Sequence, residues 1–258
     1  MGTFLFDKII FGPVKSRRLG NSLGINLLPT DFKICNFNCI YCECGWTLLK
    51  NKKFQFINAE DYSGLVSKEL KRISENNIQV DTITFAGNGE PTMHPDFDKI
   101  IEITIRNRDI YFPKAKIAVL SNSTLIGKSK VFEALQKIEL NILKLDSGIF
   151  NTIKILNGPP ANFTLEKLTE NLKQFKGNFI MQTMFIRGEY NGKTVDNTSE
   201  TEIEKWLDIV KTTKPKLVMI YTIRRDTPVN TLFPVQEEEL KRISILVKEA
   251  GFKSEISS

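Results

Sequence analysis

The chain has 258 residues, of which 41% are hydrophobic and 26% are charged, an ordinary composition for a globular protein with a large buried core. The 36 Lys and Arg against 30 Asp and Glu give a net charge of +6, which is too mild to identify a nucleic-acid-binding protein by itself. No apolar stretch approaches the ~20 residues of a membrane span, and residues 1–18 lack a basic leader followed by an apolar run. We therefore expect a cytoplasmic protein without membrane contact.

Short segments rich in Ile, Val and Phe alternate with amphipathic helical segments from about residue 22 onward. Strands are predicted at residues 23–27, 81–86, 116–121, 141–146, 179–186 and 216–223. Several of them are apolar on both faces, as strands covered by helices must be. Six strand–helix units imply parallel strands joined by right-handed crossovers.

Capping residues mark where the helices begin and end. Asn58 is predicted to cap the first helix, and Pro95 stands where the second would begin. A later helix is expected to end at Gly177. Another is expected to begin at a capping box formed by Ser199 and Glu202.

All four cysteines lie within residues 35–44. Thiolates this close bind a metal or form strained disulfides, and no other cysteines exist to build a disulfide framework. Cys35, Cys39 and Cys42 are spaced C-x3-C-x2-C and offer three thiolates to one centre. On a four-iron cluster, three thiolates leave one iron open for another ligand. A tetrahedral zinc site that also uses Cys44 is the alternative.

The spacing of these cysteines, with the aromatic Tyr41 directly before the third one, resembles the signature of radical S-adenosylmethionine (SAM) enzymes. The resemblance implies a 4Fe–4S cluster on Cys35, Cys39 and Cys42, SAM on the open iron, and Tyr41 beside the cofactor. In this family, SAM is cleaved to methionine and a 5′-deoxyadenosyl radical that abstracts hydrogen from a substrate. Cys44 would then lie near the cluster without binding it.

The turn after the second predicted strand resembles the Gly-Gly-Glu motif of the same family. It comprises Gly87, Asn88, Gly89 and Glu90, with Asn88 in place of the usual glycine. Glycines let the backbone approach a ligand closely, and a carboxylate can accept from an ammonium group. The resemblance implies that these four residues bind the amino group of SAM.

Further polar residues stand near the ends of the later strands, where parallel α/β folds gather their reactive groups. Ser121 and Asn122 resemble family positions that contact SAM, with helix capping as the alternative. Lys144 and Asp146 share one strand face and would place an opposite-charge pair beside the ligand, unless that face is exposed. Gln182 or the threonine beside it is expected to face the barrel interior.

The single histidine and two basic runs lie near the expected site, but none of them is assigned a catalytic role. His94 is the only histidine, and we expect it to pack at the start of a helix rather than act as a base. No catalytic residue is assigned. Basic runs at Lys15–Arg18 and Lys50–Lys53 flank the cysteines and would attract phosphates if they lie at the mouth of the site. Solvated loop charge is the alternative.

Six units suit the open, partial (β/α)6 barrel of radical SAM enzymes, and a doubly wound sheet is the alternative architecture. We expect one core domain over residues 1–258, with residues 1–21 as an N-terminal extension and 22–258 as the barrel. Residues 12–26, 35–45 and 84–97 resemble the wyosine-synthase-like branch, whose members act on a modified guanosine in tRNA. Those enzymes carry a second cluster, and some carry a flavodoxin domain. This chain has only Cys44 left over, and no flavodoxin domain is expected.

Three functions therefore stay open. The first is a radical SAM enzyme that modifies tRNA or another large substrate. The second is an activase that forms a glycyl radical on a partner protein, and the third is a non-catalytic, zinc-stabilised binding protein. Either enzyme would need an electron donor such as flavodoxin or ferredoxin.

Overall fold

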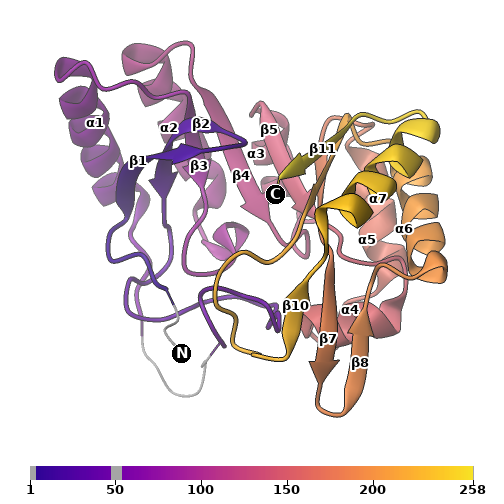
Figure 1. The fold of residues 1–258 in the computed structure, drawn as a ribbon. Coiled ribbons are helices and arrows are strands. Elements are labelled where there is room, and N and C mark those ends of the chain that lie inside the picture. Colours follow the sequence, from indigo (N-terminus) through magenta and orange to yellow (C-terminus); the bar gives the residue numbers. More distant parts are fainter. Residues whose placement is uncertain (1–3, 48–53, 258) are drawn as a thin grey trace.

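The computed structural model describes residues 4–47 and 54–257 (Figure 1). The described residues form an eight-stranded sheet with two edge strands. In spatial order its strands are β1 (Ile10–Ser16), β2 (Gly20–Ile25), β3 (Thr82–Phe85), β4 (Lys116–Ser121), β5 (Leu140–Lys144), β6 (Ile180–Met184), β9 (Leu217–Tyr221) and β11 (Ser254–Ser257).

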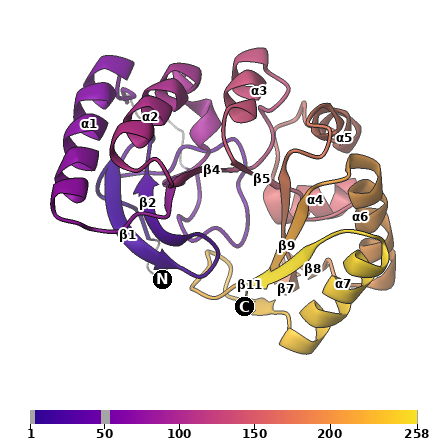
Figure 2. The same cartoon turned by 90° about the horizontal axis from the view of Figure 1, so that it is seen from above.

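All neighbouring strands from β2 to β11 are parallel, and β1 pairs antiparallel with β2. The helices of the described residues are α1 (Ala59–Glu75), the short 3-10 helix η1 (Pro91–Met93), α2 (Phe97–Tyr111), α3 (Ser129–Gln136), α4 (Phe150–Asn157), α5 (Leu165–Gln174), α6 (Glu200–Thr213) and α7 (Glu237–Glu249). Figure 2 shows the helices along the outer side of the curled sheet, with β1 and β11 on the opposite, open side. The predicted α/β partial barrel is confirmed.

The core lies between the sheet and this layer of helices. Every residue of β3 and β6 is buried, as expected for strands covered on both faces. The helices bury one face each: in α5, the buried residues Leu165, Leu168 and Leu172 recur at the predicted helical spacing. Full burial of such a side chain stabilises the fold by about 1.5–3 kcal/mol. None of the helices in the described part is both long and apolar enough to cross a membrane.

Two of the predicted helix boundaries need correction. The Asn58 cap is confirmed, because its side chain accepts from the backbone N–H of Asp61 at 2.8 Å. Pro95 was predicted to begin a helix, but α2 begins at Phe97 after the separate turn of η1. Gly177 was predicted to end a helix, but α5 already ends at Gln174, and Gly177 lies at φ +84° in the loop before β6.

The predicted capping box is half correct. Ser199 Oγ accepts from the backbone N–H of Glu202 at 3.4 Å, as predicted. The carboxylate of Glu202, however, points inward and accepts from Ser147 Oγ at 2.5 Å and from Thr152. Glu202 therefore joins α6 to α4 and to the loop before it instead of closing its own helix end.

The remaining differences concern strands outside the six predicted units. Residues 10–21, assigned to an extension, form β1 and the start of β2. The predicted strand at 179–186 divides into β6 and β7 (Ile186–Tyr190), which pairs with β8 (Lys193–Asp196) and β10 (Leu232–Pro234) in a second, antiparallel sheet. The Asn191-Gly192 turn, with positive φ at both residues, was an available hairpin signal.

Candidate active site

A cavity of about 450 Å³ brings together most of the predicted site residues. It is lined by residues of the irregular segment 33–47, the cysteine loop, which contains all four cysteines. The Gly-rich turn, the strands β4, β5 and β6, and the segment that follows β9 supply further lining residues. The predicted residues that line it are Cys35, Cys39, Tyr41, Cys42, Gly87, Gly89, Glu90, Ser121, Asn122, Lys144 and Gln182. Asn88 and Asp146 are the two predicted residues that do not.

The cysteine loop follows β2 and is anchored to the end of α4. Asn38 donates its backbone N–H to Asn157 O at 2.7 Å, and Ile40 donates to Leu156 O at 3.0 Å. The side chain of Asn38 accepts from Thr47 N at 2.9 Å, which closes the loop on itself. These bonds hold the backbone of an irregular segment and so fix the positions of its four cysteines.

The Gly-rich turn is bonded directly to the start of the cysteine loop. Ile34 N donates to Asn88 O at 2.8 Å, and Glu90 N donates to Ile34 O at 3.0 Å. Gly89 has φ +136°, and a Cβ at this position would overlap the carbonyl oxygen of Ile34. A glycine is therefore required where the two segments meet.

Each of the three predicted ligand thiols lies beside a hydrogen-bond donor. Cys35 Sγ accepts from Phe37 N at 3.4 Å and from Asn122 Nδ2 at 3.5 Å. Cys39 Sγ accepts from Asn157 Nδ2 at 3.4 Å. Interaction with the side chains of Cys44 and of the buried Lys33 lowers the pKa of Cys42 below its ordinary value. Donors around sulfur favour the thiolate form that binds metals.

Burial raises the pKa of the other two predicted ligand thiols and so opposes the effect of these donors. It raises the pKa of Cys35 to about 12 and that of Cys39 to about 11. Both are therefore neutral at pH 7 in the protein alone, and a coordinating metal would deprotonate them. The Cys44 thiol donates to Gly87 O at 3.5 Å, and interaction with Cys42 raises the pKa of Cys44.

Tyr41 is held by a buried network centred on Asp146. Asp146 accepts from the Tyr41 hydroxyl, from Asn157 Nδ2 at 2.7 Å and from Met184 N at 3.0 Å. It also pairs with Lys144 Nζ at 3.4 Å, which confirms the predicted opposite-charge pair. Asp146 thus holds the cysteine loop, and Lys144 is the member of the pair that lines the cavity.

Lys144 lies between two aromatic rings. Its Nζ donates to the Tyr221 hydroxyl at 2.6 Å and lies 5.3 and 5.1 Å from the ring centroids of Tyr41 and Tyr221. Burial alone lowers the pKa of Lys144, but Asp146, Tyr221 and Cys39 together outweigh it and raise the pKa above its ordinary value. Lys144 is therefore cationic at neutral pH.

Glu90 uses most of its acceptor capacity within the protein. Oε1 accepts from Ser121 Oγ at 2.9 Å and from both the N–H and hydroxyl of Thr92, and Oε2 accepts from Asn122 N at 2.6 Å. Burial nevertheless raises its pKa. These bonds fix the turn, and one acceptor position on Oε2 remains for a ligand.

Asn88 and His94 serve the structure around the cavity. The buried Asn88 side chain donates to Phe6 O and Pro29 O and accepts from Phe6 N, so it fastens the N-terminal segment to the turn. The His94 ring accepts from Asp96 N at 3.1 Å and bonds Ile57 O at 2.9 Å. His94 therefore packs just before the start of α2, as expected.

Four arginine side chains form a rim at the mouth of the cavity, and only two of them had been singled out from the sequence. Arg17 and Arg18, from the β1–β2 turn, and Arg224 and Arg225, from the loop after β9, all line the cavity. Arg18 lies 5.2 Å from the ring centroid of Tyr221, and Arg225 pairs with Glu43 of the cysteine loop at 2.7 Å. The other basic run, Lys50–Lys53, lies outside the described residues.

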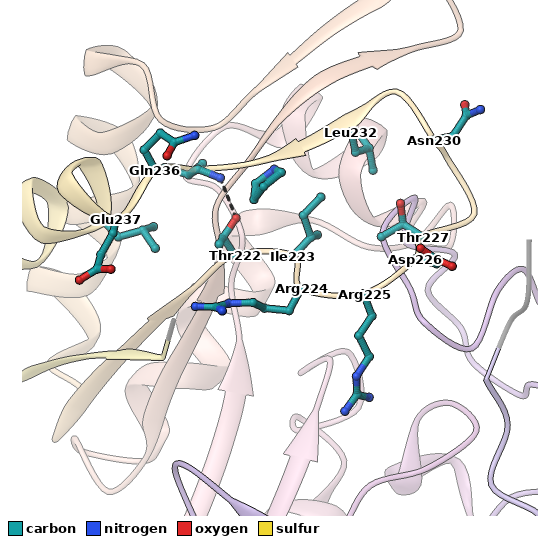
Figure 3. A pocket seen from close by; sticks show the side chains of 13 residues that line it. Thr222, Ile223, Arg224, Arg225, Asp226, Thr227, Asn230, Leu232, Gln236 and Glu237 are labelled. Atoms are coloured by element: carbon teal, nitrogen blue, oxygen red, sulfur yellow. Dashed lines mark hydrogen bonds between the residues drawn. The ribbon is translucent and has the colours of Figure 1, made fainter.

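A second cavity of about 640 Å³ adjoins the first one (Figure 3). It lies between the loop after β9 and the start of α7, and the two cavities share Thr222, Ile223, Arg224, Arg225 and Thr227. Figure 3 shows the side chains of Arg224 and Arg225 pointing in different directions from this loop. Sequence periodicity gave no signal for this second cavity, because it is lined mostly by irregular backbone.

The radical SAM superfamily model matches residues 30–200, and the chain belongs to that superfamily. A protein named GTPase Obg, from Brachyspira hyodysenteriae, is 32% identical over 92% of this chain and 33% of its own length. A UPF0026 protein of Methanocaldococcus jannaschii is 34% identical over 74% of this chain and 59% of its own length. The chain thus spans less than two thirds of either relative.

A solved structure of TYW1 with a lysine-pyruvate adduct bound shares the fold. It has a TM-score of 0.63 and 17% identity, over 88% of this chain and 73% of that one. The resemblance to a wyosine-synthase-like fold is therefore present in three dimensions as well as in the sequence.

Proposed function

We propose that this protein is a radical SAM enzyme with a 4Fe–4S cluster on Cys35, Cys39 and Cys42. The observation that carries the proposal is the convergence of these three cysteines, the Gly-rich turn and Lys144 on one cavity at the carboxyl ends of the parallel strands. When bound, the cluster supplies the electron that splits SAM into methionine and a 5′-deoxyadenosyl radical.

The arrangement of the thiols supports a cluster better than a mononuclear zinc site. Among the described residues, no group of three or more His, Cys, Asp or Glu side chains converges closely enough to hold one metal ion. In a 4Fe–4S cluster each thiolate binds its own iron, so the sulfurs need not meet at one point. The Cys44 thiol donates to Gly87 O at 3.5 Å, which also fits a neighbour of the cluster better than a fourth ligand.

The chain's own residues would position SAM. Glu90 Oε2 offers its remaining acceptor position to an ammonium group, and the turn holding it is fixed by Ser121 and Asn122. Lys144 offers a partly exposed cation to a carboxylate. Gln182 lines the same cavity with amide groups free for hydroxyls or a base edge.

The charges around the cavity support an anionic substrate, and we propose tRNA. Six cationic side chains line the cavity: Arg17, Arg18, Lys33, Lys144, Arg224 and Arg225. The carboxylates that line it are Glu43, which is paired with Arg225, and the buried Glu90. A cationic rim attracts phosphates and makes binding depend on salt concentration. The adjoining cavity offers space for a part of the substrate away from the reacting atom.

Metal analysis tests the cofactor. Anaerobically reconstituted protein should contain close to four irons and four sulfides, and SAM should perturb the electron paramagnetic resonance signal of the reduced cluster. Cys35→Ala, Cys39→Ala and Cys42→Ala should abolish the cluster, whereas Cys44→Ala should largely retain it. Stoichiometric zinc without iron, in protein handled anaerobically throughout, would contradict the proposal.

Salt-dependent binding tests the substrate class. Affinity for unmodified tRNA should fall steeply with salt and should fall again in the double variant Arg17→Ala, Arg18→Ala. A matched double variant on the remote outer helices, Lys71→Ala with Lys173→Ala, removes the same charge from exposed helix surfaces and should bind like the wild type. Undetectable tRNA binding, with unaltered tRNA nucleosides in a deletion strain, would favour a protein substrate instead.

A further inference from the structure

Lys33 is a buried cation beside the cysteines. It stands two residues before Cys35, has only 3% of its surface exposed and lines the cavity together with the three thiols. Its Nζ donates to Gly45 O at 2.9 Å, at the far end of the cysteine loop. Lys33 therefore spans the loop from beginning to end with its charge on the inside.

The charge of Lys33 has no carboxylate partner among the described residues. The side chains that interact electrostatically with it are the thiols of Cys42, Cys35 and Cys39. Lys144, the other lysine that lines the cavity, differs because Asp146 lies 3.4 Å from its Nζ. Burying an ammonium group without a counter-charge is costly. The counter-charge of Lys33 is complete only when the three sulfurs are thiolates, which is their state when they bind iron.

We propose that Lys33 is the fixed positive charge that sets the reduction potential of the cluster, an inference that rests on the proposed function. Reduction transfers one electron from a low-potential one-electron donor to the cluster and makes it more negative by one charge. A buried cation nearby stabilises the reduced form more than the oxidised form. Lys33 thus makes the cluster easier to reduce.

The test is a potentiometric titration of the reconstituted cluster with dithionite and redox mediators, followed by electron paramagnetic resonance. Lys33→Met removes the charge, Lys33→Gln removes the charge but keeps a donor for Gly45 O, and Lys33→Arg keeps the charge. Lys216→Met is the matched control, because Lys216 Nζ also donates to a backbone carbonyl, Glu139 O at 2.8 Å, and does not line the cavity.

We expect Lys33→Met and Lys33→Gln to shift the one-electron equilibrium at least tenfold towards the oxidised cluster, which is about 60 mV towards more negative potential. Lys33→Arg should stay closer to the wild type than either neutral variant, and Lys216→Met should match the wild type. Because a neutral side chain removes a buried charge, cluster-free Lys33→Met should be at least as stable as the cluster-free wild type.

Three results would overturn the inference. The first is a wild-type potential in both neutral variants, and the second is an equal shift in Lys33→Arg, which would assign the effect to packing. The third is a Lys33→Met protein that is unfolded or clearly less stable without its cluster, since that would make Lys33 a structural residue. A wild-type protein that takes up no iron would instead overturn the proposed function.

Discussion

Replacing Asp146 with alanine should destabilise the protein strongly, because its carboxylate is the centre of the buried network beside the cysteine loop. The substitution removes the acceptor for Tyr41, for Asn157 Nδ2 at 2.7 Å and for Met184 N at 3.0 Å. It also leaves Lys144, whose side chain is 15% exposed, without its counter-charge. Removing one partner of a buried ion pair costs about 3–5 kcal/mol, and we expect a loss of that size in the free energy of unfolding.

The cost of Asp146→Ala can be separated into its parts by a double-mutant cycle with Lys144→Met. The uncompensated ammonium is absent in the double variant, so its loss should be smaller than the sum of the single losses by at least about 1 kcal/mol. Urea unfolding of the cluster-free proteins gives the free energy of unfolding of the wild type, of both single variants and of the double variant. Glu75→Ala is the control, because Glu75 pairs with Lys71 on an exposed helix face, and it should change stability by less than about 0.5 kcal/mol. A loss below about 1 kcal/mol for Asp146→Ala, or strict additivity with Lys144→Met, would refute this account.

Three further substitutions test the surrounding structure. Gly89→Ala places a Cβ on a backbone carbonyl oxygen at φ +136° and should cost at least about 2 kcal/mol in urea unfolding, whereas Gly64→Ala, in open space within α1, should stabilise by about 0.5–1 kcal/mol. Burial lowers the pKa of His94 below its usual 6.5, so stability should be full above pH 6.5 and fall as the pH drops towards its lowered value. His94→Gln should flatten that part of the stability–pH curve, and an unchanged slope would contradict the lowered pKa. Glu202→Ala should cost about 1–3 kcal/mol through its buried acceptors, and a loss equal to that of exposed Glu200→Ala would show that Glu202 is only a helix-end residue.

The sequence allowed the prediction of features that depend on local spacing. The C-x3-C-x2-C run, the Gly-rich turn one strand later and the six core strands are all periodic or contiguous patterns, and each lies close to its predicted position. The Lys144–Asp146 pair followed from strand alternation alone. These features also share one physical basis, since parallel strands gather their carboxyl ends at one edge.

Features that depend on contacts between distant residues could not be predicted. The Ser199 cap was predicted correctly, but the Glu202 carboxylate accepts from Ser147, which lies in the loop before α4, instead of closing its own helix end. Glu90 was expected to serve a ligand, yet hydrogen bonds from Ser121 and Asn122, more than 30 residues away, occupy much of it. The strand β11 is short and polar, and only its pairing with β9 makes it a strand. Tertiary context outweighs local propensity in each case.

The contact between Arg18 and Tyr221 connects two segments that both lie outside the residues matched by the superfamily model. The matched part, residues 30–200, contains the three cysteines, the Gly-rich turn, Lys144 and Gln182. The arginine rim comes entirely from the flanking segments, on either side of that part. Under the proposed function, the central segment would carry the SAM chemistry, and the two outer segments, which meet at the cavity, would contact the substrate. Exchanging only these flanks between relatives should then change which substrate is bound and leave SAM cleavage in place.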